Sequence, residues 1–211
     1  VCGADPTELR SPDLMGVLGQ TVAGLTVALG HLGQLQKQLW ASPSGELGAL
    51  LGLLGELAAR IDAAKVAVVR EAATRGVIAE SDCATPSDWV LTQSPPATQV
   101  KDAVTVARVA IAGAHPRWQR LDQAVLAGGV APAMADAVMR EFVKLHDSLD
   151  VSMHEDVLDA LTQLAEAGHS TRDLTRARER LIAQYGQPGE LDRMHQRLTA
   201  RRSMSAFGRD L

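Results

Sequence analysis

The chain has 211 residues, of which 46% are hydrophobic but only 3% aromatic, and its formal net charge is −4. This length suffices for one large domain or two small helical domains. A core built mainly from Ala, Leu and Val favours helices packed on helices over a sheet, because strands draw more on aromatic and β-branched residues.

A narrow apolar seam runs along the first predicted helix, from about residue 14 to 40. Glycines interrupt this helix and each lowers its propensity by about 1 kcal/mol relative to alanine, so the helix needs a partner surface. We expect the seam to pack against the next helix of the same chain, and dimerisation is the alternative. The seam residues alternate at steps of four and three, with Gln36 as a polar interruption, and are Leu18, Val22, Leu25, Leu29, Leu32 and Leu39.

A second apolar stripe predicts a helix from about 44 to 75, ended by Gly76. Because the break between the two stripes is short, the two helices are expected to form a long antiparallel hairpin. Capping hydroxyl residues and prolines then mark a series of shorter helices, with capping boxes predicted at Thr85 with Asp88, Ser152 with Glu155, and Ser170 with Asp173. These are expected at about 86–93, 95–113, 116–127, 132–146, 152–167, 170–185 and 188–202. The predicted fold is all-α, a multi-helix bundle that begins with the hairpin.

The helices around Thr85 to Ala112 have a helix-turn-helix outline, with Ser94-Pro95-Pro96 as the turn. Lys101 and Arg108 on the exposed face of the second helix are candidates for DNA contact. A helix that reads a major groove usually carries more Arg, Asn or Gln, so a bundle corner is the alternative. The residues expected to be buried on this helix are Val100, Ala103, Val104, Ala107 and Ala110.

Positive charge gathers near the end of the chain. Residues 1–169 carry 12 basic and 20 acidic side chains, whereas residues 170–211 carry nine arginines and five acids. Arginine suits planar recognition of phosphates or carboxylates. If the chain binds nucleic acid, we expect these arginines to contribute most, and internal pairing with acids is the alternative. The candidates are Arg172, Arg176 and Arg180, which share a helix face, and Arg197, Arg201 and Arg202.

No catalytic pattern is visible. The sequence lacks Gly-x-Ser-x-Gly, His-Glu-x-x-His, a phosphate-binding loop and a glycine-rich dinucleotide turn. His146, Asp150 and His154 would share a face on one continuous helix. Ser152 with Glu155 indicates the cap of a new helix instead, which favours a polar loop over a metal site. We therefore predict no catalytic residue, no metal and no cofactor.

The sequence also predicts where the protein resides. Cys2 and Cys83 lack the spacing of a metal or redox site, which indicates reduced thiols and a cytoplasmic location. The uncharged run from Leu14 to Gln36 contains polar residues and five glycines, too many for a membrane span. No membrane association is expected.

Three blocks of sequence carry a resemblance to a known family. They are AARIDAAKVAVVREAATRG at 58–76, TPSDWV at 85–90 with the segment 97–110, and LAGGVAPAMA at 126–135. Over about residues 45 to 205 the chain resembles the actinobacterial domain of unknown function 222, the 13E12 repeat family. The resemblance implies a helical module that accompanies an HNH endonuclease domain, with the catalytic residues in that nuclease domain. The family's Arg-rich helix is not matched at 97–103.

These observations divide the chain into an N-terminal helix that is a candidate for oligomerisation (1–43), a helical domain (44–205) and the start of a truncated segment (206–211). The leading prediction is a non-catalytic accessory module of an HNH-endonuclease-type protein, used for nucleic-acid engagement, docking or dimerisation. The partners expected are DNA and a second copy of the chain. The alternatives are a free-standing helical interaction protein without a nucleic-acid role and a stand-alone DNA-binding regulator.

Overall fold

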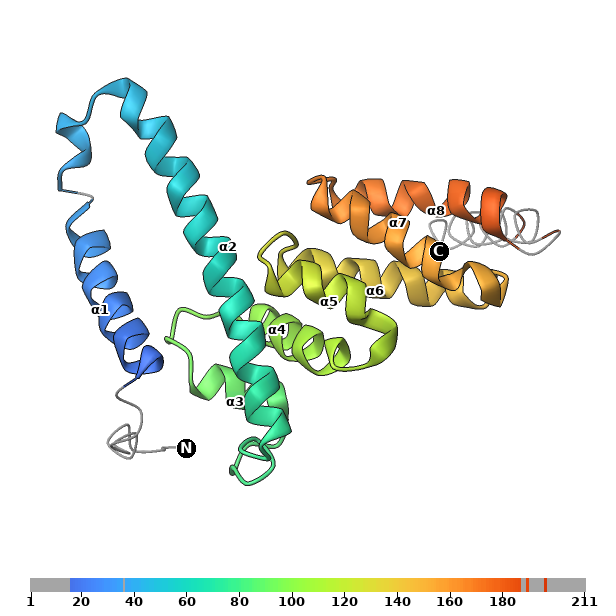
Figure 1. Ribbon diagram of the computed structural model, residues 1–211, viewed down its shortest axis with the longest axis horizontal. Helices are drawn as coiled ribbons and strands as arrows, with labels where there is room; N and C mark the ends of the chain where they lie inside the picture. The colour runs from blue at the N-terminus through green and yellow to red at the C-terminus, as the bar shows by residue number, and fades with distance from the viewer. Residues whose placement is uncertain (1–15, 36, 187–188, 190–195, 197–211) are drawn as a thin grey trace, which may run out of the picture. The chain divides into compact units, whose positions relative to one another are not determined.

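The computed structural model describes residues 16–35, 37–186, 189 and 196, and this part of the chain is helical (Figure 1). Within it there is no strand beyond one isolated antiparallel bridge between Leu149 and Gly186. The prediction of an all-α, multi-helix fold is confirmed. The helices are α1 (Val17–Leu35), α2 (Ser44–Thr74), α3 (Pro86–Thr92), α4 (Val100–Gly113), α5 (Gln119–Leu126), α6 (Pro132–His146), α7 (His154–Glu166) and α8 (Thr171–Tyr185), with short 3-10 turns η3 (Leu39–Ala41), η4 (Pro116–Trp118) and η5 (Val151–Met153).

The chain divides into two compact units, residues 1–58 and residues 59–211. In the first unit, α1 and the beginning of α2 run in opposite directions on either side of η3, as the predicted hairpin requires (Figure 1). The helix α1 is shorter than expected, because it ends at Leu35 and Leu39 lies in η3. The boundary between the units falls inside α2 and not at its start.

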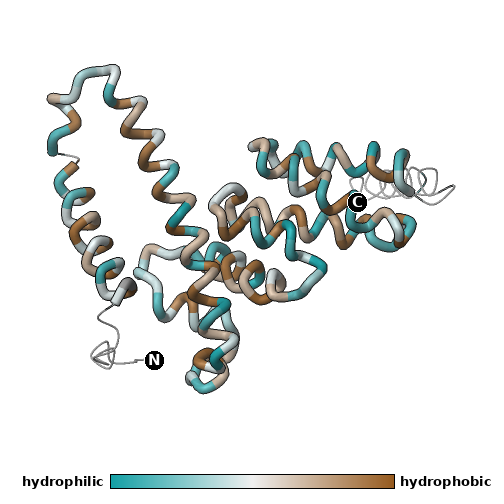
Figure 2. The backbone as a smooth tube through the Cα atoms, viewed as in Figure 1, coloured by the Kyte–Doolittle hydropathy of each residue, from teal (hydrophilic) through white to brown (hydrophobic). Residues whose placement is uncertain are grey.

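The core lies in the second unit. Helix α6 is central to it and packs against α4, α7 and α8. Hydrophobic residues recur at short intervals along these helices (Figure 2), and those that face inward are buried. The largest fully buried side chains include Phe142, Leu121, Leu145, Leu161 and Leu174. The core is therefore aliphatic with few aromatic rings, as the composition indicates.

Two of the predicted helix caps are present. The Thr85 hydroxyl accepts a hydrogen bond from the Asp88 N–H at 3.2 Å, and Pro86 occupies the first turn of α3. Ser170 and Asp173 form a complete capping box at the start of α8. The third prediction is wrong: Asp150 accepts from the Ser152 N–H at 2.9 Å and caps η5. Here the nearer carboxylate takes the N–H, and α7 begins at His154.

Three carboxylates buried in the second unit join helices that lie far apart in the sequence. Each accepts hydrogen bonds from a guanidinium on another helix, which offsets the free energy lost when the charge leaves water. The pairs are Asp122 with Arg70, Asp136 with Arg108, and Glu141 with Arg178. Buried acids of this unit are therefore compensated by arginines, of which Arg70 and Arg178 are largely buried and Arg108 stays half exposed.

Candidate functional site

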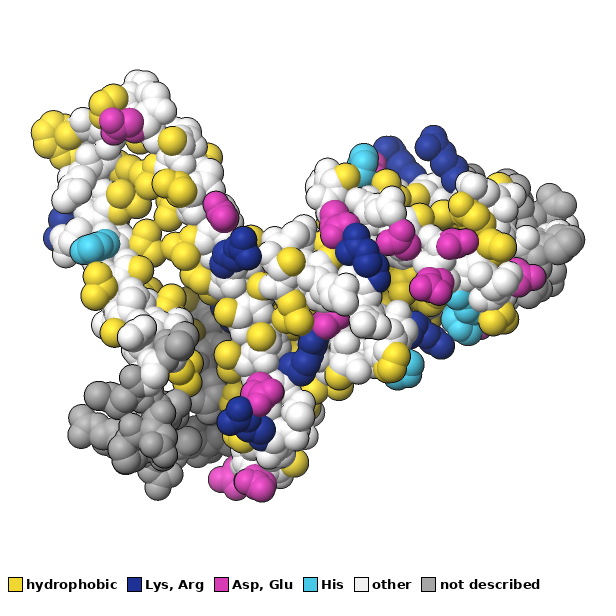
Figure 3. Space-filling view, viewed as in Figure 1, with side chains coloured by type: hydrophobic (Ala, Val, Ile, Leu, Met, Phe, Trp, Pro, Cys, Tyr) yellow, Lys and Arg dark blue, Asp and Glu magenta, His cyan; other side chains and the backbone are white. Residues whose placement is uncertain are grey.

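The apolar seam of α1 is exposed. Leu18, Val22, Leu25, Leu29 and Leu32 keep between 37% and 70% of their surface accessible to solvent. The helix α1 is not among the helices that pack closely, and the expectation of an intramolecular seam is wrong. Figure 3 shows hydrophobic side chains along both helices of this hairpin.

Several glycines of the hairpin have open space around them. A side chain placed at Gly24, Gly30 or Gly33 of α1, or at Gly48 or Gly52 of α2, would meet nothing within 4 Å. These glycines leave open space on the surfaces of both helices, and the seam leucines are exposed to water. The seam is an exposed apolar surface, with Leu39 half-buried in η3 beside it.

The arginines predicted on α8 lie on the surface. Arg172, Arg176 and Arg180 are exposed at four-residue steps, and they share one face of the helix. Arg176 lies 3.7 Å from the Asp173 carboxylate, which neutralises part of this face. Arg178 points to the other side and reaches Glu141 at 3.4 Å. The second predicted cluster, at Arg197, Arg201 and Arg202, lies outside the described residues.

The cations predicted on α4 have different surroundings. Lys101 is exposed in the first turn, whereas Arg108 donates to Asp136 of α6 at 2.8 Å. The helices α3 and α4 do pack together, but α4 begins at residue 100 and not at 95. Val100 was expected in the core and is 64% exposed, because it stands at the first position of the shortened helix. Arg108 therefore connects helices of the bundle.

His146 and His154 lie on two helices, as the expected break between them requires. Helix α6 ends at His146 and α7 begins at His154. Their rings lie 4.3 Å apart between centroids, and both contact Phe142 edge to face. The Nε2 atom of His154 lies 3.1 Å from the His146 carbonyl oxygen. Across the described residues, no three His, Cys, Asp or Glu side chains come together as a metal site.

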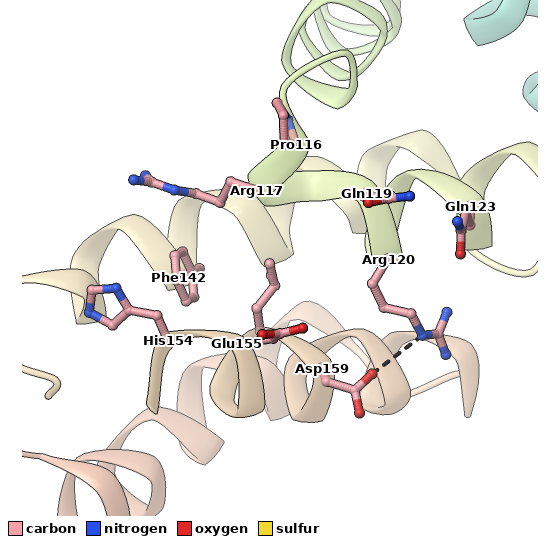
Figure 4. A pocket seen from close by; sticks show the side chains of 10 residues that line it. Pro116, Arg117, Gln119, Arg120, Gln123, Phe142, His154, Glu155 and Asp159 are labelled. Atoms are coloured by element: carbon pink, nitrogen blue, oxygen red, sulfur yellow. Dashed lines mark ion pairs between the residues drawn. The ribbon is translucent and has the colours of Figure 1, made fainter. Parts of the chain in front are cut away.

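A cavity of about 600 Å³ opens beside this histidine pair, between the η4–α5 segment and α7 (Figure 4). Arg120 reaches across it from α5, with Nε 3.3 Å from Asp159 and both Nη atoms donating to Glu166 at 3.0 and 2.6 Å. The hydrogen bond to Glu166 raises the pKa of Arg120 above its ordinary value. Arg117 points away from this pair (Figure 4).

The chemistry of that cavity is that of a mixed-charge surface. Its acids and cations neutralise one another, and among the described residues that line it there is no hydroxyl or thiol to act as a nucleophile. Perturbed carboxylates lie elsewhere, at caps: hydrogen bonds from Ser152 lower the pKa of Asp150, and those from Ser170 lower the pKa of Asp173. The geometry gives more support to surfaces for association than to a catalytic centre.

Two surface cations of interest were not predicted from the sequence. Arg140 and Lys144 of α6 stand beside Arg108 at the edge of a hollow between α4 and α6. Their four-residue spacing indicates that they share one face of a helix. Only the packing of α4 on α6 places them beside Arg108.

Among the described residues, none of the helices combines the length and apolar character needed to cross a bilayer. Comparison of the chain with family models, curated proteins and solved structures found no match. The resemblance to the domain of unknown function 222 thus stays a prediction.

Proposed function

We propose that this chain is a non-catalytic helical module that self-associates through its N-terminal hairpin and serves an HNH-endonuclease-type protein as a docking and dimerisation element. The observation that carries the proposal is the exposed seam of α1. The sequence resemblance motivates the link to an HNH protein.

The exposed area suits a dimer. Within residues 16–58, ten large hydrophobic side chains are exposed, most of them over about half of their surface. A standard interface buries about 800 Å² on each partner, and the seam residues among these side chains would form its apolar centre, whereas Val27 lies on the opposite face of α1. The ten exposed side chains are Leu18, Val22, Leu25, Val27, Leu29, Leu32, Trp40, Leu47, Leu51 and Leu53.

The spacing also suits a helical partner. Apolar residues at alternating steps of four and three interlock with the same pattern on a facing helix. Two hairpins that pair in this way form a four-helix bundle, which buries both seams at once. The glycines of α1 and α2, open on their surface, let helix backbones approach closely. A second copy of the chain supplies the complementary surface without any further component.

Sedimentation velocity over a range of concentrations tests this. The wild type is expected to change from monomer to dimer, and a Leu25→Glu/Leu29→Glu double variant is expected to remain monomeric. A matched control places the same charges at exposed apolar positions of the second unit, Val68→Glu and Val151→Glu. A wild type that stays monomeric at all concentrations contradicts the proposal, and so does a control that dissociates as much as the seam variant.

The HNH association has its own test. The coding sequence that follows Leu211 is expected to continue in frame into a His-rich ββα-metal pattern. A stop codon directly after Leu211 contradicts an HNH domain on the same chain.

A second function, binding of duplex nucleic acid, is favoured by the exposed arginines of α8. Arg172, Arg176 and Arg180 are expected to contact phosphates, so affinity for generic DNA should fall steeply with salt. Changing all three to Ala should weaken binding at about 50 mM salt more than a Lys101→Ala/Arg108→Ala change does. Greater loss from the α4 variant contradicts this location, and no binding by wild type removes the function.

A further inference from the structure

Two hollows adjoin along α4 in the second unit. One of about 340 Å³ lies beside α3 and α4, lined by apolar side chains that include Pro86, Val104 and Ile111. The other, of about 430 Å³, lies between α4 and α6 over Met139 and Val143. Arg108 and Ala112 line both hollows, so the two lie next to each other on either side of these residues. We call the two hollows together the α4–α6 groove.

Apolar side chains stand exposed at the edges of the groove. Ile111 of α4 is 45% exposed and Val143 of α6 is 59% exposed. Val100, also exposed, extends the apolar surface to the first turn of α4. From Val100 to Ile111 this surface is about 17 Å long, the length of three turns of helix.

Asp136 holds two cations at the rim of the groove. Its carboxylate is nearly buried, accepts a hydrogen bond from Arg108 Nη1 at 2.8 Å and forms an ion pair with Arg140, whose Nε lies 3.1 Å away and donates to the Asp136 main-chain carbonyl at 3.3 Å. Both arginines remain more than half exposed. A guanidinium has five N–H donors, so each arginine can bind a further carboxylate without releasing Asp136. One buried negative charge thus faces two positive charges.

Glu141 repeats this arrangement one turn further along α6. It is nearly buried and lies 2.6 Å from Lys144 Nζ and 3.4 Å from Arg178 Nη1. Lys144 is 53% exposed and stands at the rim of the groove. Arg178 lies outside the groove, whose lining has three cations, Arg108, Arg140 and Lys144, and the rim therefore carries a surplus of positive charge. In the described part of the chain, Asp136 is the single acid that lines the groove.

We infer that the α4–α6 groove binds an acidic amphipathic helix of a partner protein, whose aliphatic side chains fill the hollows and whose carboxylates pair with Arg108, Arg140 and Lys144. An apolar floor with polar edges is the usual receptor for such a helix. Charge complementarity sets its orientation and excludes basic segments. A nucleic-acid backbone would use the cations but gain nothing from the apolar floor. The groove is formed by residues of the second unit alone, so this inference does not depend on dimerisation through the hairpin.

Fluorescence anisotropy with a synthetic probe tests the groove. The probe is a fluorescein-labelled helical peptide of about 18 residues, with Leu at i, i+3, i+4 and i+7 positions and Glu on both flanks. An isomer with Lys in place of Glu is the comparison. The full chain is expected to bind the Glu peptide at least about tenfold more tightly than the Lys peptide. Equal binding of both peptides overturns the inference.

Variants locate the binding without unfolding the protein. Arg140→Gln/Lys144→Gln removes the surplus charge but leaves Arg108 on Asp136 and Arg178 on Glu141, so each buried carboxylate keeps a partner. This variant is expected to bind the Glu peptide about tenfold more weakly. The matched control Lys65→Gln/Arg75→Gln removes two cations from surface ion pairs elsewhere and is expected to bind as the wild type does. Equal losses from both variants refute the groove.

Val143→Gln tests the apolar contact separately from charge, since this side chain is exposed and a neutral polar replacement should not disturb folding. It is expected to abolish binding of the Glu peptide while the dimerisation state stays unchanged. If it alters self-association, a second copy occupies the groove and the inference is wrong. If duplex DNA displaces the peptide and the rim variant loses DNA affinity more than peptide affinity, nucleic acid is the occupant and the inference is also wrong.

Discussion

The ion pair between Arg70 of α2 and Asp122 of α5 should make a large contribution to the stability of the second unit. Its two side chains are only 20% and 11% exposed. Arg70 binds the carboxylate with both Nη atoms, at 2.6 Å for Nη1, and its Nε donates to the Ala110 carbonyl at 3.2 Å. One guanidinium thus holds three helices together, α2, α4 and α5.

Removing one partner leaves the other charge poorly solvated. For a well-buried pair this lowers the free energy of unfolding by about 3–5 kcal/mol. Because both side chains here retain some contact with water, we expect about 2–4 kcal/mol for Asp122→Ala or Arg70→Ala. Replacing both, as in Arg70→Met/Asp122→Leu, should recover a large part of the loss because no charge is then left unpaired.

Urea unfolding followed by circular dichroism measures these differences. The control is Lys65→Ala, whose surface pair with Asp62 is more exposed and should contribute less than about 1 kcal/mol. If both single variants at the buried pair change stability no more than this control, the reasoning is refuted. A double variant that is less stable than either single variant would also contradict it.

Gly113→Ala should lower the free energy of unfolding by about 1–3 kcal/mol in the same urea assay. The added Cβ would lie 2.5 Å from atoms of both Arg70 and Asp122. Hydrogen bonds from Ser170 lower the pKa of Asp173, so the unfolded chain takes up this proton at higher pH than the folded chain does. The cap therefore stabilises the fold above the ordinary Asp pKa of about 4, and this stabilisation is lost as the pH falls through the lowered pKa of Asp173. Thermal unfolding should therefore show that the stability difference between wild type and Asp173→Asn becomes smaller as the pH is lowered. Plasmid DNA incubated with the repurified chain and Mg²⁺ or Mn²⁺ should remain uncut on a gel.

Each of these predictions has a result that opposes it. An unchanged unfolding midpoint for Gly113→Ala would mean that the two side chains move aside without loss. If the stability difference between wild type and Asp173→Asn does not vary with pH, protonation of Asp173 does not contribute to unfolding at low pH. Metal-dependent nicking that disappears in a His146→Ala/His154→Ala variant would show that the histidine pair binds a catalytic metal.

The features that the sequence predicted well are local ones. The caps at Thr85 and Ser170 depend on residues three positions apart, so their pattern suffices to place the starts of α3 and α8. The helix class follows from apolar periodicity and a low aromatic content. The cap at Ser152 was not predicted correctly. Asp150 and Glu155 can both accept a hydrogen bond from the Ser152 N–H, and the sequence pattern does not show which of them does.

The features that depend on tertiary packing were not predictable. Arg108 and Asp136 are 28 residues apart, and nothing in either helix alone indicates that they pair. The α1 seam has the apolar pattern of a core helix. Whether such a seam is buried depends on how another helix packs against it, and the glycines of α1 and α2 have open space around them. The α4–α6 groove likewise arises only from the packing of one helix on another.

The claim that the hairpin is a dimerisation surface is tested most directly by amide hydrogen exchange at low and high protein concentration. Burial of the seam in a second copy should slow exchange in residues 17–35 and 44–58 as concentration rises, while exchange in α4 and α6 stays the same. Identical exchange in the hairpin at both concentrations would contradict the account.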